Sequence, residues 1–263
     1  MGIVLITMQG DSHRAFANRL HRATGQGVDL VIIQKSKFRT PAGRLRRIWT
    51  IARSGAFWSE LSYGLLLRFS PETQRALTYF ARTSIAPEDS GPYEPKTLEV
   101  DDINSAESVA LLTKLSPDLL MIWRSPILHR PILETAKTVI NFHMGLCPYY
   151  RGSVANQFAV FKGDREHIGS VIHYVAKEVD RGDIIAQVRA DTTKRPREMF
   201  RELNDAVLKR YIEIAVKILH GEDIPAERQD RGKGAYYALK QWTNEVRYKV
   251  GRRLVEWERT GKF

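Results

Sequence analysis

Four short apolar runs, separated by stretches with other spacing, constrain the fold of this chain more than any other feature. The runs cover residues 2–8, 28–34, 118–123 and 138–143. Continuous apolar runs of this length are typical of strands buried on both faces of a parallel sheet. Between the first two runs, Asp11 or Ser12 is a suitable cap for a helical pattern that continues through Leu20. The order strand, helix, strand predicts an α/β fold.

Further segments extend this pattern to about residue 220. We expect a strand at 97–100, a helix capped by Asn104 or Ser105, helices at 127–136, near 154–162 and at 197–219, and a β-ribbon at 169–180. The sequence therefore predicts a Rossmann-like, mostly parallel twisted sheet with flanking helices over residues 1–220. Residues 221–263 are expected to form a short, basic and aromatic C-terminal helical extension.

A basic, helical insertion at 35–95 interrupts the sheet pattern. From Lys35 to Ser59 there are seven cations and no acid, and apolar residues near helical spacing predict an amphipathic helix there. The whole chain of 263 residues carries a net charge of +11. This excess favours anionic partners such as nucleotides, phosphorylated metabolites, RNA or an acidic membrane surface. A solvated helix face is the simpler interpretation of the run.

Cysteine and hydropathy exclude several classes of protein. The single cysteine, Cys147, excludes an internal disulfide framework and a cysteine-rich metal site, and we expect it to pack in the core. No run approaches the ~20 apolar residues of a membrane span. Since the beginning of the chain has no basic lead-in, we expect a cytoplasmic protein without a signal peptide and without a membrane span.

The segment NFHMGLCPYYRG at 141–152 holds a candidate for chemistry. Alternation along a strand points Asn141 and His143 to the same face. They end a predicted parallel strand, where open α/β sheets bind ligands. The pair offers an amide donor for an oxyanion and an imidazole that exchanges protons near neutral pH. Local structural hydrogen bonding is the alternative role for both.

Charged residues crowd a second segment, VAKEVDRGDIIAQ at 175–187. A carboxylate from this loop would orient the imidazole and stabilise its charged form, as an acid partner does in a catalytic triad. The alternative is a solvated surface turn, because charged loops usually lie at the surface.

In combination these motifs are more specific. Asn-x-His, then Leu-x-Pro-x-x-Arg-Gly, then Val-Asp-x-Gly-x-Ile about thirty residues later resemble the 10-formyltetrahydrofolate-dependent formyltransferase family. The resemblance covers residues 97–220 and the strand–loop–helix start at 3–20. It implies that Asn141, His143 and Asp180 are the catalytic residues. The chain departs from many relatives at two positions, which hold glycine at 145 and cysteine at 147.

The resemblance also implies a reaction and a formyl donor. An amine attacks the formyl carbon of 10-formyltetrahydrofolate, with His143 as general base, Asn141 as oxyanion donor and Asp180 as the residue that fixes the imidazole tautomer. No metal is implied. The pterin is expected to lie against the backbone of two segments, represented by Trp123, Arg124, Ile127, Leu128, Val175 and Val179.

The acceptor amine is the least constrained part of the prediction. Methionyl-tRNA formyltransferases carry an additional C-terminal barrel, for which the residues after 219 are too few. Glycinamide ribonucleotide enzymes carry a Gly-Ser-Asn turn, where this chain has QGDSHR at 9–14. The best match is a nucleotide-linked 4-amino-4,6-dideoxy sugar such as GDP-perosamine, used in lipopolysaccharide O-antigen synthesis. Candidate contacts to its phosphates are Ser12, Arg14 and Arg151.

Other partners stay open. The acceptor is alternatively glycinamide ribonucleotide, methionyl-tRNA or hydroxyornithine, or the chain is a non-catalytic RNA-binding relative. Residues 231–263 hold nine cations and three acids with interleaved aromatic residues. That composition suits RNA, but a helical cap or a homodimer contact is the favoured interpretation, and we expect no nucleic-acid partner.

Overall fold

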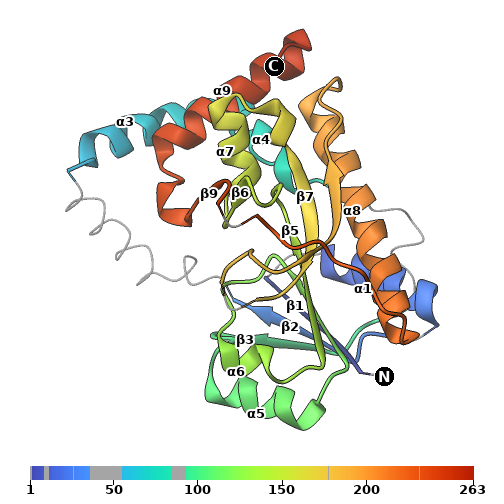
Figure 1. The fold of residues 1–263 in the computed structure, drawn as a ribbon. Coiled ribbons are helices and arrows are strands. Elements are labelled where there is room, and N and C mark those ends of the chain that lie inside the picture. Colours follow the sequence, from blue (N-terminus) through green and yellow to red (C-terminus); the bar gives the residue numbers. More distant parts are fainter. Residues whose placement is uncertain are drawn as a thin grey trace.

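The computed structural model describes residues 2–8, 12–25, 27–35, 55–84, 93–176, 178–230 and 232–263, with the side chains of Ser12 and His13 excepted. A seven-stranded sheet forms its centre, and helices lie on both faces of that sheet (Figure 1). The strands are β1 (Ile3–Met8), β2 (Leu30–Gln34), β3 (Thr97–Val100), β4 (Leu119–Trp123), β5 (Thr138–His143), β6 (Tyr150–Arg151), β7 (Gly169–Tyr174), β8 (Ile184–Arg189) and β9 (Ala235–Tyr236).

The helices lie in the connections between these strands, except the last one, which follows β9. They are α1 (Ser12–Thr24), α3 (Phe57–Arg68), α4 (Pro71–Ala76), α5 (Ala106–Leu115), α6 (Arg130–Leu133), α7 (Ala155–Lys162), α8 (Pro196–Leu219) and α9 (Asn244–Thr260). Three-residue 3-10 turns occur at Tyr79–Ala81, Arg165–His167 and Leu239–Gln241. No helix in the described ranges is both long enough and apolar enough to cross a bilayer.

The strand order in the large sheet is β3-β2-β1-β4-β5-β7-β8. The first five strands are parallel, whereas β7 and β8 run antiparallel to their neighbours. The chain moves outward from β1 to β3 and then returns to β4 on the other side of β1. This reversal is the topological switch point of a doubly wound fold, beside which ligands bind at the carboxyl ends of the strands. The predicted mostly parallel α/β sheet is confirmed.

Alternating side chains of the strands build two cores. From β1, Ile3 and Leu5 enter the larger core with residues of α1 and α8, while Val4 and Ile6 enter a smaller core with residues of α5 and α6. Tyr211 of α8 reaches into the sheet, where its hydroxyl accepts a hydrogen bond from the Ile122 amide (2.9 Å). The same hydroxyl lies 2.9 Å from the Ile140 carbonyl, so α8 joins β4 to β5 beside the residues singled out above.

Several sequence expectations are confirmed at the level of single elements. The strands at 97–100 and 138–143 have the expected bounds, and Ser105 caps α5 by accepting from the Ser108 amide. Asn104 has another role, because its amide donates to the Ile127 carbonyl (3.0 Å) and its oxygen accepts from the His129 amide (2.7 Å). These bonds hold residues 127–129 outside a helix.

The helix expected at 127–136 is therefore shorter, at Arg130–Leu133. The ribbon expected at 169–180 ends at Tyr174 and pairs with Ile184–Arg189, so the described residues 175–176 and 178–183 belong to the hairpin loop. Most of the amphipathic helix expected between 35 and 59 falls on 36–54, outside the described residues.

The segment after 220 packs on the sheet-bearing body. Glu227 forms an isolated antiparallel bridge with Ile184 at the start of β8, and β9 pairs with β6. In α9, Val250, Leu254 and Trp257 have no exposed surface. The extension thus shares the larger core, and it also reaches the candidate site described next.

Candidate active site

Three polar side chains meet at the carboxyl-terminal half of β5. Asn141 and His143 project from the same face of this strand, and the loop between β7 and β8 brings Asp180 over them. The Asp180 carboxylate lies 3.4 Å from Nδ1 of His143 and 3.4 Å from Nδ2 of Asn141. Phe142, between them in sequence, points to the opposite face and stacks on Trp123 at 6.0 Å. The structure therefore brings together the three residues that the motifs singled out.

Asp180 is held by backbone groups as well as by side chains. Its φ of 52° lies in the left-handed region, which is uncommon for a residue other than glycine. The Gly152 amide donates to its carboxylate at 2.8 Å. Gly152 itself has a φ of 93°, and a Cβ there would lie 2.4 Å from the Tyr237 carbonyl oxygen, so this position requires glycine.

Gln229, from the C-terminal extension, secures the same loop. Its side-chain amide donates to the carbonyls of Asp180 (3.0 Å) and Gly182 (2.6 Å). Sequence reasoning missed this residue, because no local motif connects a glutamine beyond residue 220 with a loop about fifty residues earlier. The short bridge between Glu227 and Ile184 places it there.

His173 is a further polar residue of the cluster, beside the three that the motifs singled out. In the β5–β7 register it lies directly opposite Asn141, and its Nε2 is 3.1 Å from Nδ2 of Asn141. Its Nδ1 is 2.8 Å from the Tyr174 carbonyl oxygen, which only accepts, so Nδ1 carries the hydrogen. With the hydrogen on Nδ1, Nε2 of His173 is available to accept from the amide of Asn141. Pairing the two strands in antiparallel register would have revealed this contact.

His143 lies between two acceptors. Its Nε2 is 3.1 Å from the Tyr150 carbonyl oxygen, and its Nδ1 is 3.4 Å from the Asp180 carboxylate. A neutral imidazole donates from only one nitrogen, whereas an imidazolium donates from both. The imidazolium that forms when His143 takes up a proton therefore has a hydrogen-bond acceptor next to each of its two nitrogens.

Burial and neighbouring charges set the protonation states of the cluster. Burial lowers the pKa of His143, and the charges of His173 and Arg151 act in the same direction, while Asp180 opposes them. Burial disfavours ionisation of Asp180, but His143, His173 and the Gly152 amide together hold the pKa of this carboxyl well below its usual range. The cluster therefore presents an ionised Asp180 beside an imidazole that is neutral at neutral pH, as a general base requires.

Cys147 and Arg151 flank the cluster. Cys147 has no exposed surface, and burial raises the pKa of its thiol, so it packs as a core residue, as expected from the sequence. Arg151 is also buried, with 7% of its surface exposed, and its Nε has no hydrogen-bond partner. It is one of the three residues for which we predicted phosphate contacts.

The other two predicted phosphate contacts lie elsewhere. Ser12 begins α1, but its side chain is outside the described residues. Arg14 is exposed on α1 and lies 3.5 Å from Glu94. Among the described residues, no hydrogen bond or ion pair joins Arg14 to Arg151.

The two segments predicted to border the folate both contact the sheet-bearing body. Leu128 and Val139 pack against the same core, and the Val175 amide donates to the Val139 carbonyl at 3.0 Å. Ile127 is 53% exposed and Val179 is half-buried, so each keeps apolar surface that a ligand can contact. The Trp123 side chain is buried in the core, and Arg124 lies over its ring at 5.0 Å, so a pterin reaches these two positions only through their main chain or the guanidinium.

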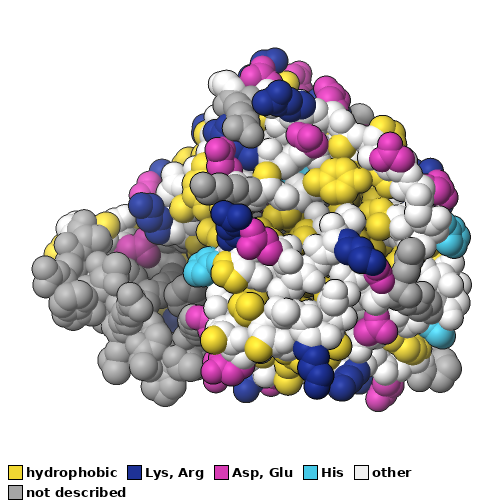
Figure 2. All heavy atoms as spheres, turned by 60° about the horizontal axis from the view of Figure 1, so that its bottom comes forward, with side chains coloured by type: hydrophobic (Ala, Val, Ile, Leu, Met, Phe, Trp, Pro, Cys, Tyr) yellow, Lys and Arg dark blue, Asp and Glu magenta, His cyan; other side chains and the backbone are white. Residues whose placement is uncertain are grey.

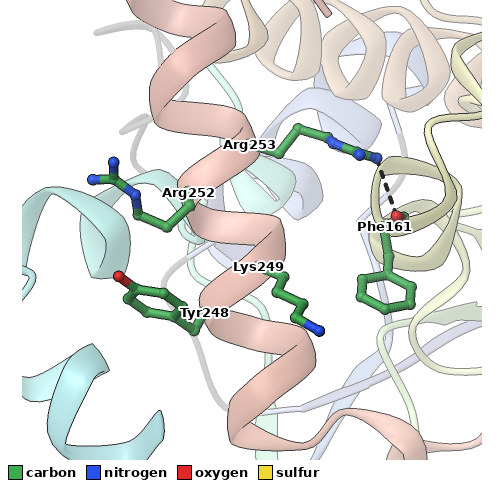
Figure 3. A pocket seen from close by; sticks show the side chains of 5 residues that line it. All are labelled: Phe161, Tyr248, Lys249, Arg252 and Arg253. Carbon is green, nitrogen blue, oxygen red and sulfur yellow. Dashed lines mark hydrogen bonds between the residues drawn. The ribbon is translucent and has the colours of Figure 1, made fainter.

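A separate hollow lies on α9 (Figure 3). It has a volume of about 320 Å³ and is lined by Phe161, Tyr248, Lys249, Arg252 and Arg253. Lys249 bonds Glu245 of its own helix, and Arg252 bonds Glu72 of α4. Arg253 donates to a carbonyl at the end of α7. These cations are occupied by groups of the protein itself, and the hollow shares no residue with the Asn141–His143–Asp180 cluster.

Within the described ranges, no three His, Cys, Asp or Glu side chains are grouped so as to hold a metal.

Comparison with known proteins identifies the family. The model of the formyl transferase family matches residues 73–218, which is more than half of the chain and includes the whole cluster on β5 and the loop that carries Asp180. The chain belongs to the formyl transferase family.

Relatives by sequence are similar over part of their length. A methionyl-tRNA formyltransferase of Limosilactobacillus fermentum is 32% identical over 51% of this chain and 44% of its own length. One of Bacillus subtilis is 27% identical over 63% of this chain and 50% of its own length. The chain thus spans about half the length of the curated relatives it matches.

Solved structures share the fold at low sequence identity. A sugar N-formyltransferase from a Shewanella species has a TM-score of 0.55 at 14% identity, covering 97% of this chain and 88% of its own. A phosphoribosylglycinamide formyltransferase from Anaplasma phagocytophilum has a TM-score of 0.53 at 17% identity, covering 91% and 98%. Both share the fold over more than nine tenths of this chain.

Proposed function

We propose that the protein is an N-formyltransferase that moves a formyl group from 10-formyltetrahydrofolate to an amine. The observation that carries this proposal is the Asn141–His143–Asp180 cluster within a chain of the formyl transferase family. In the reaction the amine nitrogen bonds to the formyl carbon, and the bond from that carbon to the folate nitrogen breaks. The amine loses one proton and the folate nitrogen gains one, so the protein needs only to move protons and stabilise an oxyanion.

His143 is the base in this proposal. Its lowered pKa keeps it neutral when the amine attacks. When it takes the proton, the Asp180 carboxylate and the Tyr150 carbonyl accept hydrogen bonds from its two nitrogens. Asp180 thus stabilises the charged imidazole.

Asn141 supplies the oxyanion donor. The two hydrogens of its Nδ2 face His173 Nε2 at 3.1 Å and the Asp180 carboxylate at 3.4 Å. The longer contact is the weaker one, so an oxyanion displaces it at the lower cost while His173 keeps the amide oriented. Loss of one such donor typically raises the barrier by ~3 kcal/mol in other enzymes.

For the acceptor, we propose the amine of a nucleotide-linked 4-amino-4,6-dideoxy sugar, with GDP-perosamine as the first compound to test. The support is the net charge of +11, which suits a diphosphate, and the buried Arg151 beside the cluster, whose Nε lacks a partner. Methionyl-tRNA is the second candidate, favoured because the sequence relatives described above are methionyl-tRNA formyltransferases.

An acceptor panel tests the proposal. The full chain is mixed with 10-formyltetrahydrofolate and, separately, with GDP-perosamine, dTDP-linked amino sugars, glycinamide ribonucleotide, hydroxyornithine and methionyl-tRNA. Release of tetrahydrofolate and formylation of the acceptor are followed together, and His143→Ala serves as the inactive control. Turnover with a nucleotide sugar supports the proposed acceptor. Turnover with methionyl-tRNA or another amine alone contradicts the acceptor and preserves formyl transfer. Absence of folate binding contradicts formyl transfer itself.

A further inference from the structure

Helix α3 is placed on the protein with its apolar side outward. Trp58, Leu61, Leu65 and Phe69 recur at helical spacing along α3 and its C-cap residue, and each is at least 44% exposed, with Trp58 and Phe69 at 77%. We refer to these four residues as the apolar stripe. At 1.5 Å per residue the stripe extends for about 16 Å along the helix. An ordinary surface helix buries such a stripe and exposes its polar side.

Polar contacts fix this unusual orientation. On the opposite side of α3, Glu60 is 9% exposed, and its carboxylate accepts from the Asn244 amide of α9 at 2.9 Å. The Asn244 side chain donates to the Glu60 carbonyl, also at 2.9 Å. Tyr63 contacts Tyr248 of α9 with ring centroids 5.8 Å apart, and Leu67 is buried. Rolling α3 to bury the stripe would break these contacts and leave Glu60 without its partner.

The location and charge of α3 favour an anionic surface as the partner. The helix lies at the margin of the molecule, next to α9 (Figure 1). The sequence that leads into it, from Lys35 to Ser59, carries seven cations and no acid, and Arg68 lies in its last turn. The acids of α3 and α4 are already bonded, Glu60 to Asn244 and Glu72 to Arg252. By contrast, the face shown in Figure 2 intermixes Lys and Arg with Asp and Glu.

We propose that the apolar stripe inserts into the interface of an anionic lipid bilayer. Exposed Trp, Phe and Leu on one side of a helix, with Arg68 in its last turn and a cation-rich sequence before it, are features shared with helices that lie in the membrane interface. A second copy of the chain is the weaker candidate, because each copy carries a net charge of +11 and like charges repel. RNA accounts for the cations but gives no role to Leu61 and Leu65, which offer no ring for base stacking.

Vesicle binding tests this proposal independently of formyl transfer. The full chain is sedimented with vesicles of phosphatidylcholine alone, or of phosphatidylcholine and phosphatidylglycerol in equal parts. We expect binding to the mixed vesicles that weakens as salt is added, and little binding to the neutral ones. Absence of binding to mixed vesicles at low salt overturns the proposal.

Two variants show whether the stripe carries the binding. Trp58→Ser with Phe69→Ser changes the two most exposed side chains and should lower partitioning to mixed vesicles by roughly tenfold or more. Leu115→Ser on α5, where leucine is 42% exposed, is the matched control and should bind as the parent does. Far-ultraviolet circular dichroism verifies folding, and Trp58→Ser alone serves if the double variant unfolds.

Two results contradict the lipid assignment. Undiminished binding by the folded stripe variants would assign the interaction to the cations alone. A dimer in analytical ultracentrifugation that these variants dissociate would assign the stripe to a second copy. Formyl transfer in solution should be unchanged in the Trp58→Ser, Phe69→Ser double variant and in Leu115→Ser, since none of these three residues belongs to the candidate site.

Discussion

Nδ2 of Asn141 lies 3.1 Å from Nε2 of His173, directly across the antiparallel ladder between β5 and β7. The Tyr174 carbonyl, 2.8 Å from Nδ1 of His173, fixes the hydrogen on that nitrogen and leaves Nε2 to accept. The direction of the Asn141 amide is therefore set by its neighbour across the ladder. His173 is a positioning residue for the proposed oxyanion donor.

Replacement of His173 by phenylalanine removes the acceptor while keeping a ring of similar size. We expect kcat to fall about tenfold, which corresponds to ~1.4 kcal/mol, because Asn141 loses its orientation. The KM for 10-formyltetrahydrofolate should stay close to that of the parent. His129→Phe, at an exposed position, is the control. Equal losses in both variants, or a change confined to KM, would exclude a positioning role.

The rate should decline on the acid side at a pH below the ordinary range of histidine. Burial lowers the pKa of His143 from 6.5, and the base must be neutral to accept the proton. Acidification should also lower the stability of the fold. The unfolded state binds protons at His143 and Asp180 at a higher pH than the folded state does, because the fold lowers the pKa of both groups. A profile of kcat/KM against pH, with parallel denaturant unfolding, measures both effects.

Asp180→Asn should shift the acid limb of the kcat/KM profile in a defined direction. The carboxylate of Asp180 raises the pKa of His143 against the effect of burial, so its removal should shift the acid limb to still lower pH, at a reduced maximum rate. An acid limb that stays in place or moves upward would show that His143 is not the group that titrates.

Gly145 leaves no room for a side chain. A Cβ at this position would lie 2.5 Å from Nε2 of His143 and 2.7 Å from the Tyr150 carbonyl oxygen. Gly145→Ala should therefore displace the imidazole and lower kcat at least tenfold, with a smaller effect on folate binding. Gly232→Ala, where the nearest atom to a Cβ is an Asp230 oxygen at 3.3 Å, is the matched control. Full activity in Gly145→Ala would contradict the described packing around His143.

Gln229 connects the C-terminal extension to the loop that carries Asp180. Gln229→Ala leaves the carbonyls of Asp180 and Gly182 without their donor, at a cost of ~1–3 kcal/mol for an unpaired buried group. We expect a lower free energy of unfolding and a fall of about tenfold in kcat, because the Asp180 loop loosens. Gln241→Ala, at an exposed position of the same extension, controls for loss of a glutamine. Stability and kcat equal to the parent values would show that the extension does not support the loop.

The strands and the sheet class were predictable because the information is local. Buried parallel strands have continuous apolar sequences, and Thr97–Val100 and Thr138–His143 have the expected bounds. The helix at 127–136 was overpredicted because its periodicity competes with Asn104, a residue distant in sequence that binds the backbone of 127–129. Side-chain hydrogen bonds to the backbone at long range are not visible in a local pattern.

The residues of the candidate site likewise divide into those that the local sequence predicts and those that depend on contacts distant in sequence. Asn141 and His143 follow from strand alternation, and the motif points to Asp180. His173 and Gln229 depend on strand register and on where the chain returns after 220, which a single sequence does not specify. The outward stripe of α3 contradicts the usual expectation that such a stripe faces the core, because polar contacts with Asn244 set its orientation.

The most direct test of the account is a comparison of the parent protein with His143→Ala, using 10-formyltetrahydrofolate and the acceptor that the panel identifies. Binding of the folate is measured by calorimetry, and formylated product by mass spectrometry. If His143 is the general base, folate affinity stays within a few-fold of the parent and turnover falls by at least a hundredfold, the lower range for a positioned general base. Turnover by His143→Ala at a rate close to that of the parent would contradict that role.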